Sequence, residues 1–130
     1  MITITQLHNE YRLNGTLAHL DSATGPAKLQ IYEGARPATA GDPATGSLLV
    51  QITLTQPAGV VANGQLTLTQ LEDGLISTSG LATWGRFVNG DGQACFDADV
   101  DDGTNNGEIQ MATRQLFAGG DAKLVGAVLG

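Results

Sequence analysis

The chain has 130 residues, a length that suits one domain around one hydrophobic core. Six lysine and arginine residues stand against thirteen aspartate and glutamate residues, which gives a net charge of −7. Because this charge repels DNA phosphates and anionic lipids, we expect no nucleic-acid partner and no membrane partner. The single cysteine, Cys95, excludes an internal disulfide and a multi-cysteine metal site, and it suits synthesis in a reducing cytoplasm. We see no export signal, and no segment reaches the roughly 20 apolar residues of a membrane span.

Residues 3–23 are predicted to form a helix. Their larger apolar residues recur mostly at three- and four-residue steps, at Leu7, Tyr11, Leu17 and Leu20. Thr3 or Thr5 can serve as the N-cap, because a threonine hydroxyl accepts a hydrogen bond from a free backbone N–H of the first turn. Asn14 and Gly15 form a weak point at which the helix could break. We therefore expect a helical arm over residues 1–25.

After Gly25 and Pro26 the apolar period changes from a helical spacing to two, the spacing of a strand. The clearest strand, 48–54, places apolar residues on one face and Gln or Thr on the other. Asn63 and Gly64 are a hairpin-turn signal. The remaining strands are predicted at 29–31, 66–68, 75–78, 81–88, 93–100, 108–113 and 123–129.

Turn residues separate these short runs about every 8–12 residues, which is typical of a β-sandwich or a barrel. We predict an all-β fold, a single-domain β-sandwich over residues 1–130 with about 7–8 strands and the N-terminal helix. Residues 33–46, rich in Pro, Gly and Ala, are interpreted as an exposed loop that contacts a partner.

An acidic cluster gives a weak calcium candidate, made of Asp97, Asp99, Asp101 and Glu108. Their spacing matches the first, third, fifth and twelfth positions of an EF-hand loop. The sixth position of that loop must be glycine, but here it is Asp102, and Gly103 comes one residue late. The preceding segment alternates like a strand, with Phe96, Ala98 and Val100 expected to point inward. We therefore favour a solvated strand face followed by a turn, and we predict no metal and no cofactor.

No set of catalytic residues is recognised. His8 and His19 lie eleven residues apart on the predicted helix, about three turns, so they cannot share a metal within one chain. Aspartates close to Cys95 should raise the pKa of its thiol, which disfavours a nucleophile. Trp84 and Arg86 alternate on one strand, where Trp84 is either a core anchor or an interface residue, and we favour the core. We predict that the protein is not an enzyme.

Two segments, LQIYEGARPATAGDPATGSLLVQITL (29–54) and GLATWGRFVNGDGQACFDADV (80–100), resemble a family of small structural proteins of tailed bacteriophages and prophages. The family shows an N-terminal helix, a Tyr-x-Gly strand end followed by a Pro-Ala loop, a Thr-Trp strand and an Asp-x-Asp-Val strand end. The corresponding residues are Tyr32, Gly34, Arg36, Pro37, Ala38, Leu48, Leu49, Thr83, Trp84, Arg86, Asp97, Asp99, Val100, Ala118 and Gly119. The resemblance covers most of the chain, and its motifs are architectural. Asn14 and Gly15 in the helix, and an end poor in β-branched residues, depart from the pattern.

The resemblance implies a virion protein, and some proteins of this kind are jelly-roll capsid cement (decoration) proteins. These bind the outside of an icosahedral head and bridge neighbouring major capsid proteins. The resemblance thus implies synthesis in the host cytoplasm, a place on the capsid exterior, the major capsid protein as partner, and self-association. Our candidate partner-binding residues are Leu7, Tyr11, Leu17, Tyr32, Arg36, Pro37, Pro43 and Arg86.

Three points stay open at the level of sequence. A jelly roll and an immunoglobulin-like sandwich share the same strand pattern. A head–tail joining or tail-surface protein of the virion would share the same resemblance. A carbohydrate-binding or adhesin-type module could present Trp84, Tyr11 and Tyr32 to sugar rings, although such modules usually carry more aromatic residues.

Overall fold

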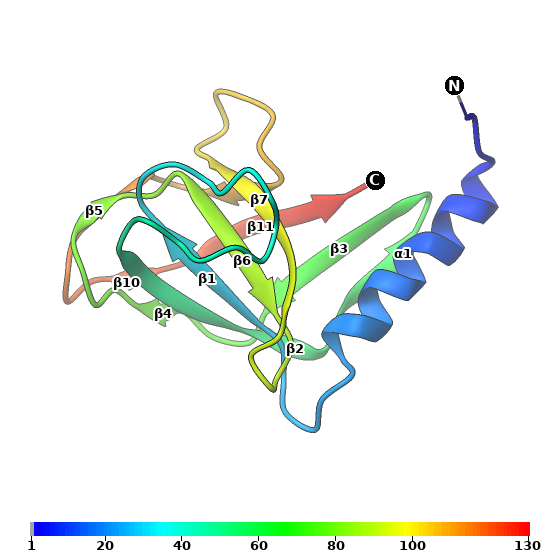
Figure 1. The fold of residues 1–130 in the computed structure, drawn as a ribbon, viewed down its shortest axis with the longest axis horizontal. Helices are drawn as coiled ribbons and strands as arrows, with labels where there is room; N and C mark the ends of the chain where they lie inside the picture. Colours follow the sequence, from blue (N-terminus) through cyan, green and yellow to red (C-terminus); the bar gives the residue numbers. More distant parts are fainter. Residues whose placement is uncertain (1) are drawn as a thin grey trace.

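The computed structural model describes residues 2–130. One N-terminal helix is followed by strands (Figure 1), so the predicted β-rich fold with an N-terminal helix is confirmed. The elements are α1 (Gln6–Leu20), β1 (Lys28–Tyr32), β2 (Leu48–Ala62), β3 (Gln65–Gln70), β4 (Gly74–Leu75), β5 (Gly80–Leu81), β6 (Trp84–Val88), β7 (Ala94–Asp101), β8 (Ile109–Met111), β9 (Gln115–Leu116), β10 (Asp121–Ala122) and β11 (Leu124–Leu129). Among these residues, no helix has both the length and the apolar character needed to cross a membrane.

The helix α1 is shorter than predicted, and it is not broken. Thr5, one of the two predicted N-caps, accepts a hydrogen bond from the backbone N–H of His8 at 3.1 Å. Gly15 lies on an exposed part of the helix, where its lack of a side chain costs only about 1 kcal/mol relative to alanine. Leu13 and Leu20 are buried on either side of this glycine, so packing holds the helix together across it.

The strands close into a barrel in the order β1-β2-β3-β11-β8-β7-β6, which corrects the predicted sandwich. Closure follows because β1 pairs with both β2 and β6. All ladders are antiparallel except the one between β7 and β8, which is parallel. An alternating sequence satisfies a sandwich and a barrel equally, because both bury one face of every strand. Only the long-range pairing of the strands separates the two folds.

The hydrophobic core contains the inward apolar residues of the barrel strands, and Leu13 and Leu20 of α1 belong to the same cluster. Gly85 of β6 lies on this inner face. A Cβ at that position would come within 2.7 Å of Ile109 Cδ1 and 2.9 Å of Leu29 Cδ1. The glycine is therefore required for close packing across the barrel. The helix α1 packs across β2 and β3, beside the long hairpin that they form (Figure 1).

The predicted strands are present, with shifted ends. The pattern at 48–54 lies within β2, which continues to Ala62 through an irregularity in its pairing with β3. The predicted Asn63-Gly64 turn is confirmed, with φ of 53° and 75° at these two residues. The predicted strand 75–78 is reduced to β4, and 81–88 divides into β5 and β6.

Two short two-stranded sheets lie outside the barrel, and the sequence does not indicate them. We call these four strands, β4, β5, β9 and β10, the outer ribbon. The strands β4 and β5 leave the barrel and pair with β10 and β9, respectively. The segment between β9 and β10 contains Gly119 and Gly120. Strands of two residues contain no alternation, so a period-two search cannot detect them.

Candidate functional site

The outer face of β1, β6 and β7 carries a second buried cluster. The Tyr32 and Trp84 rings stack with their centroids 4.6 Å apart and their planes 13° from parallel. The guanidinium carbon of Arg86 lies 5.2 Å from the centre of the Trp84 ring, within the range of a cation–π contact. Arg86 also forms a bidentate ion pair with Asp97, with Nε–Oδ1 at 2.8 Å and Nη2–Oδ2 at 3.1 Å. We call Tyr32, Trp84, Arg86 and Asp97 the outer cluster.

The loop over residues 33–46 covers the outer cluster. Arg86 Nη2 donates a hydrogen bond to the backbone oxygen of Asp42 at 2.7 Å, and Thr83 Oγ1 donates to the backbone oxygen of Gly34 at 2.6 Å. The side chains of Arg86 and Asp97 are only 9% and 3% exposed as a result. The loop is exposed on its outer side, as predicted, but its inner side is a cover for the barrel wall.

Trp84 is buried, as favoured from sequence, but it lies outside the barrel core rather than in it. Its indole Nε1 has no hydrogen-bond partner among the described residues. The buried ring is not accessible to a sugar, so in this conformation it cannot serve as the aromatic platform of a carbohydrate-binding module. Arg86, a candidate partner-binding residue, is likewise buried under the loop over 33–46. Its hydrogen bond to Asp97 raises the pKa of its guanidinium, which stays charged.

The four residues of the calcium candidate do not converge. Asp97 forms an ion pair with Arg86. Asp99 points outward, and its Oδ1 lies 3.6 Å from Nε of Arg36. Asp101 is only 2% exposed and faces its own loop, and Glu108 is exposed beside a groove described below. Within residues 2–130, no three His, Cys, Asp or Glu side chains are grouped so that they could hold a metal ion.

Asp101 organises the loop between β7 and β8. Its carboxylate accepts hydrogen bonds from the backbone N–H of Asp102 at 2.8 Å, from that of Asn105 at 3.0 Å and from Gln110 Nε2 at 3.2 Å. Burial opposes the charge of this carboxylate, but the hydrogen bonds from Gln110 and from the loop backbone outweigh it and lower its pKa. The role of Asp101 in the structure is to hold a turn.

The remaining reactive side chains stand apart. Cys95 is half-buried, and burial raises the pKa of its thiol, the direction expected from sequence. The cause is desolvation rather than the nearby aspartates. His8 and His19 are exposed at different ends of α1.

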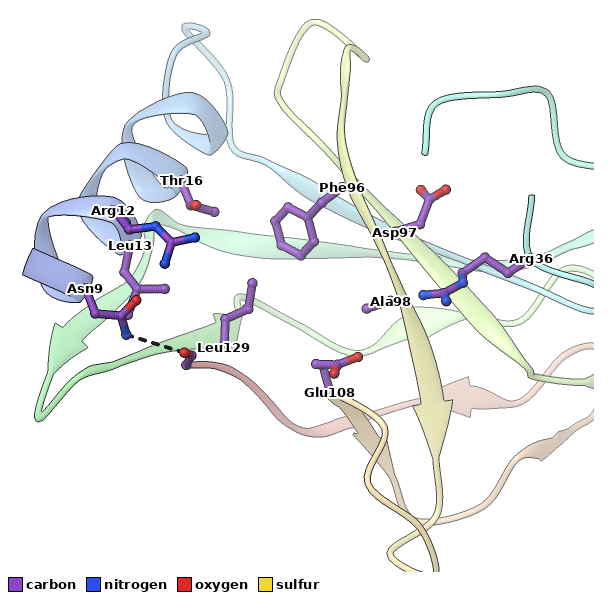
Figure 2. A pocket seen from close by; sticks show the side chains of 11 residues that line it. Asn9, Arg12, Leu13, Thr16, Arg36, Phe96, Asp97, Ala98, Glu108 and Leu129 are labelled. Carbon is purple, nitrogen blue, oxygen red and sulfur yellow. Dashed lines mark hydrogen bonds between the residues drawn. The ribbon is translucent and has the colours of Figure 1, made fainter. Parts of the chain in front are cut away.

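A groove lies between α1 and the barrel wall, with a volume of about 500 Å³. Figure 2 shows that Arg12 and Arg36 reach into it from opposite sides, toward Phe96 and Ala98. Its walls come from α1, from the loop over 33–46, from β7 and from the end of β11. The residues that line it are Asn9, Arg12, Leu13, Thr16, Arg36, Phe96, Asp97, Ala98, Glu108, Leu129 and Gly130.

The candidate partner-binding residues are spread over separate surfaces. Leu7 and Tyr11 are 65% and 71% exposed on the outer side of α1. Pro43 is exposed on the loop, whereas Pro37 is half-buried there. Leu17 is half-buried and packs against the core.

The sequence patterns did not indicate a further group of exposed apolar side chains. Leu75, Leu81 and Phe117 lie on the outer ribbon, and Phe117 is 66% exposed. Figure 1 shows β4, β5 and β10 at one end of the long axis of the molecule and α1 at the other. An aromatic residue inside the turn-rich run Phe117–Gly120 is the one sequence signal that could have indicated this surface.

The exposed side of α1, the outer ribbon and the groove are three candidate contact surfaces of this chain. The first two are apolar, and the third combines an apolar floor with two arginines. A scan against protein-family models, a search of curated proteins and a search of solved structures each find no match to this chain.

Proposed function

We propose that the protein is a non-enzymatic structural protein that bridges other protein subunits. The observation that carries the proposal is the placement of two groups of exposed apolar residues at opposite ends of the long axis of the molecule, with the closed barrel between them (Figure 1). Leu7 and Tyr11 mark the first, and Leu75, Leu81 and Phe117 mark the second. Large apolar side chains exposed at both ends favour contact surfaces there. A bridge between two neighbours needs two such surfaces held at a fixed distance, and a closed barrel provides the rigid spacer.

The more specific proposal is a capsid cement protein of a tailed bacteriophage, with the major capsid protein as its partner. Its support is the resemblance of residues 29–54 and 80–100 to small phage structural proteins. A protein that binds only the assembled lattice stabilises that lattice by mass action. Many identical copies, each attached at two points, would turn a modest contact into strong attachment. Self-association of free copies belongs to the same proposal.

The experiment uses empty mature heads of the phage or prophage whose genome encodes this chain. The full chain is incubated with the heads and sedimented, and the bound copies are located by image reconstruction. Many copies on the facets are expected. A ring of few copies at a vertex would instead support a head–tail joining protein, and absence from the pelleted particles would contradict the virion role.

Paired variants test the two apolar ends. Tyr11→Ala and Phe117→Ala should each weaken binding to heads, because each removes a large exposed apolar side chain from one end. Val60→Ala is the matched control, since Val60 is 68% exposed but belongs to neither surface. Equal binding to heads by all three variants would contradict the proposal that the two apolar ends make the contacts.

A further inference from the structure

The wall of the barrel has an incomplete seam beside the groove. Strand β7 pairs with β6 over residues 94–99, but it pairs with β8 only at Val100 and Asp101. Among the described residues, 96–98 therefore have a ladder partner on one side only, and Cys95 lies at an irregularity of the pairing with β6. An unpaired strand edge offers free N–H and C=O groups to another extended chain. The groove between α1 and β7 lies along this edge (Figure 2).

The seam exposes part of the apolar interior. Phe96 and Leu129 are half-buried and pack against the core, and both line the groove. A second hollow of about 410 Å³ continues from them toward Cys95 and His19. A third, of about 310 Å³, lies beyond Arg36 and is lined by the loop over 33–46. Because neighbouring hollows share lining residues, the groove is elongated, a shape that suits an extended segment rather than a compact molecule.

The charges along the groove favour an acidic occupant. Arg12 forms no ion pair with any described residue, and Arg36 has only the exposed contact with Asp99 at 3.6 Å. Asp97 is neutralised by Arg86, so Glu108 is the remaining acidic side chain that lines the groove. Two of the six basic residues of a chain with net charge −7 thus face one groove from opposite sides.

We propose that this groove binds an extended acidic segment of a partner protein, which adds as a strand to the free edge of β7. Side chains at alternate positions of a strand point to one face, and positions four residues apart lie about 13 Å from each other. Acidic side chains along such a segment would meet Arg12 on one side of the groove and Arg36 on the other, and an apolar side chain between them would cover Phe96 and Leu129. Strand addition of this kind takes its affinity from backbone hydrogen bonds and its specificity from the side chains. The inference deepens the bridging role and rests on it, because it names the chemistry of one partner segment.

The test measures peptide binding to the full chain without capsids. The probe is a fluorescein-labelled, end-capped peptide of sequence Thr-Glu-Thr-Val-Thr-Glu-Thr, followed by fluorescence polarisation. The same peptide with lysine in place of both glutamates should bind at least about tenfold more weakly, and added salt should weaken the acidic peptide. The double variant Arg12→Gln/Arg36→Gln should lose about tenfold in affinity, because two exposed charge contacts are removed. Lys123→Gln, which removes an exposed charge remote from the groove lining, should bind like the unmodified chain.

Amide hydrogen exchange locates the bound peptide. Residues 96–98 should gain protection in the complex, and methylation of alternate backbone nitrogens of the peptide should abolish binding. Equal affinity for the lysine peptide, or protection confined to other strands, would overturn the proposal. So would preferential binding of an Ile-Thr-Ile-Thr peptide copied from residues 2–5, because a second copy of this chain would then be the occupant. Absence of binding by every peptide would overturn the groove proposal, whereas the bridging role is tested separately by co-sedimentation with heads, so the two failures are distinguishable.

Discussion

The two faces of β6 show two different ways to bury a strand. The inner face, with Gly85 and Phe87, packs against the other barrel strands. The outer face, with Trp84 and Arg86, is covered by the irregular loop over 33–46 and is held by an ion pair and hydrogen bonds. The inner face depends on shape, and the outer face depends on polar partners. The two faces should therefore respond differently to substitution.

The largest effect is expected where the outer cluster loses a charge. Asp97→Ala leaves Arg86 buried without its partner, which should lower the free energy of unfolding by about 3–5 kcal/mol. The measurement is urea-induced unfolding followed by circular dichroism. The double variant Arg86→Met/Asp97→Leu should recover most of the loss, since a buried ion pair can be replaced by apolar side chains at little cost. A double variant as unstable as Asp97→Ala would show that the ion pair itself, and not the unpaired charge, determines the stability.

The inner face should fail through crowding. Gly85→Val adds a side chain whose Cβ alone would lie within 3 Å of both Ile109 and Leu29, so we expect a loss of about 1–3 kcal/mol or more. The same unfolding measurement checks this, and Gly126→Val is the control, because a Cβ at Gly126 in β11 meets no atom within 4 Å. Equal destabilisation by both variants would mean that loss of glycine, and not contact across the barrel, causes the effect.

A smaller effect should separate the loop from the barrel. Thr83→Val removes the hydroxyl that donates to the Gly34 backbone oxygen while keeping the shape of the side chain, which should cost about 1 kcal/mol. The loss should be local, so amide exchange in residues 33–46 should accelerate more than exchange in β1 or β2. Uniform acceleration throughout the chain would indicate that the loop and the barrel unfold as one unit.

The same contrast explains what could be predicted from sequence. Alternation identified the inward residues of β7 and the helical spacing identified α1, because both patterns arise from local geometry. The cover over Trp84 and the ion pair of Asp97 could not be predicted, because an irregular loop has no periodicity that shows where it folds back. Barrel closure was also hidden, since it depends on pairing between β1 and β6, which are distant in sequence. Of the candidate site, Arg36 and Glu108 were identified individually, but their position on one groove with Arg12 was not.

The smallest effect concerns the loop between β7 and β8, which the Asp101 carboxylate holds by hydrogen bonds. Unlike the loop over 33–46, it covers no apolar cluster. The pKa of Asp101 is lower in the folded chain than its ordinary value of about 4. The unfolded chain therefore binds the proton more readily, and the stabilisation that Asp101 provides is complete above that ordinary value. It is lost as the pH falls through the lower folded value, so the free energy of unfolding should decrease below about pH 4. Asp101→Asn should flatten this decrease, measured by urea unfolding at a series of pH values, whereas Glu72→Gln, at an exposed position, should not. If the two variants showed the same pH dependence, the acid sensitivity would come from general charge repulsion, and the hydrogen bonds to Asp101 would contribute nothing specific.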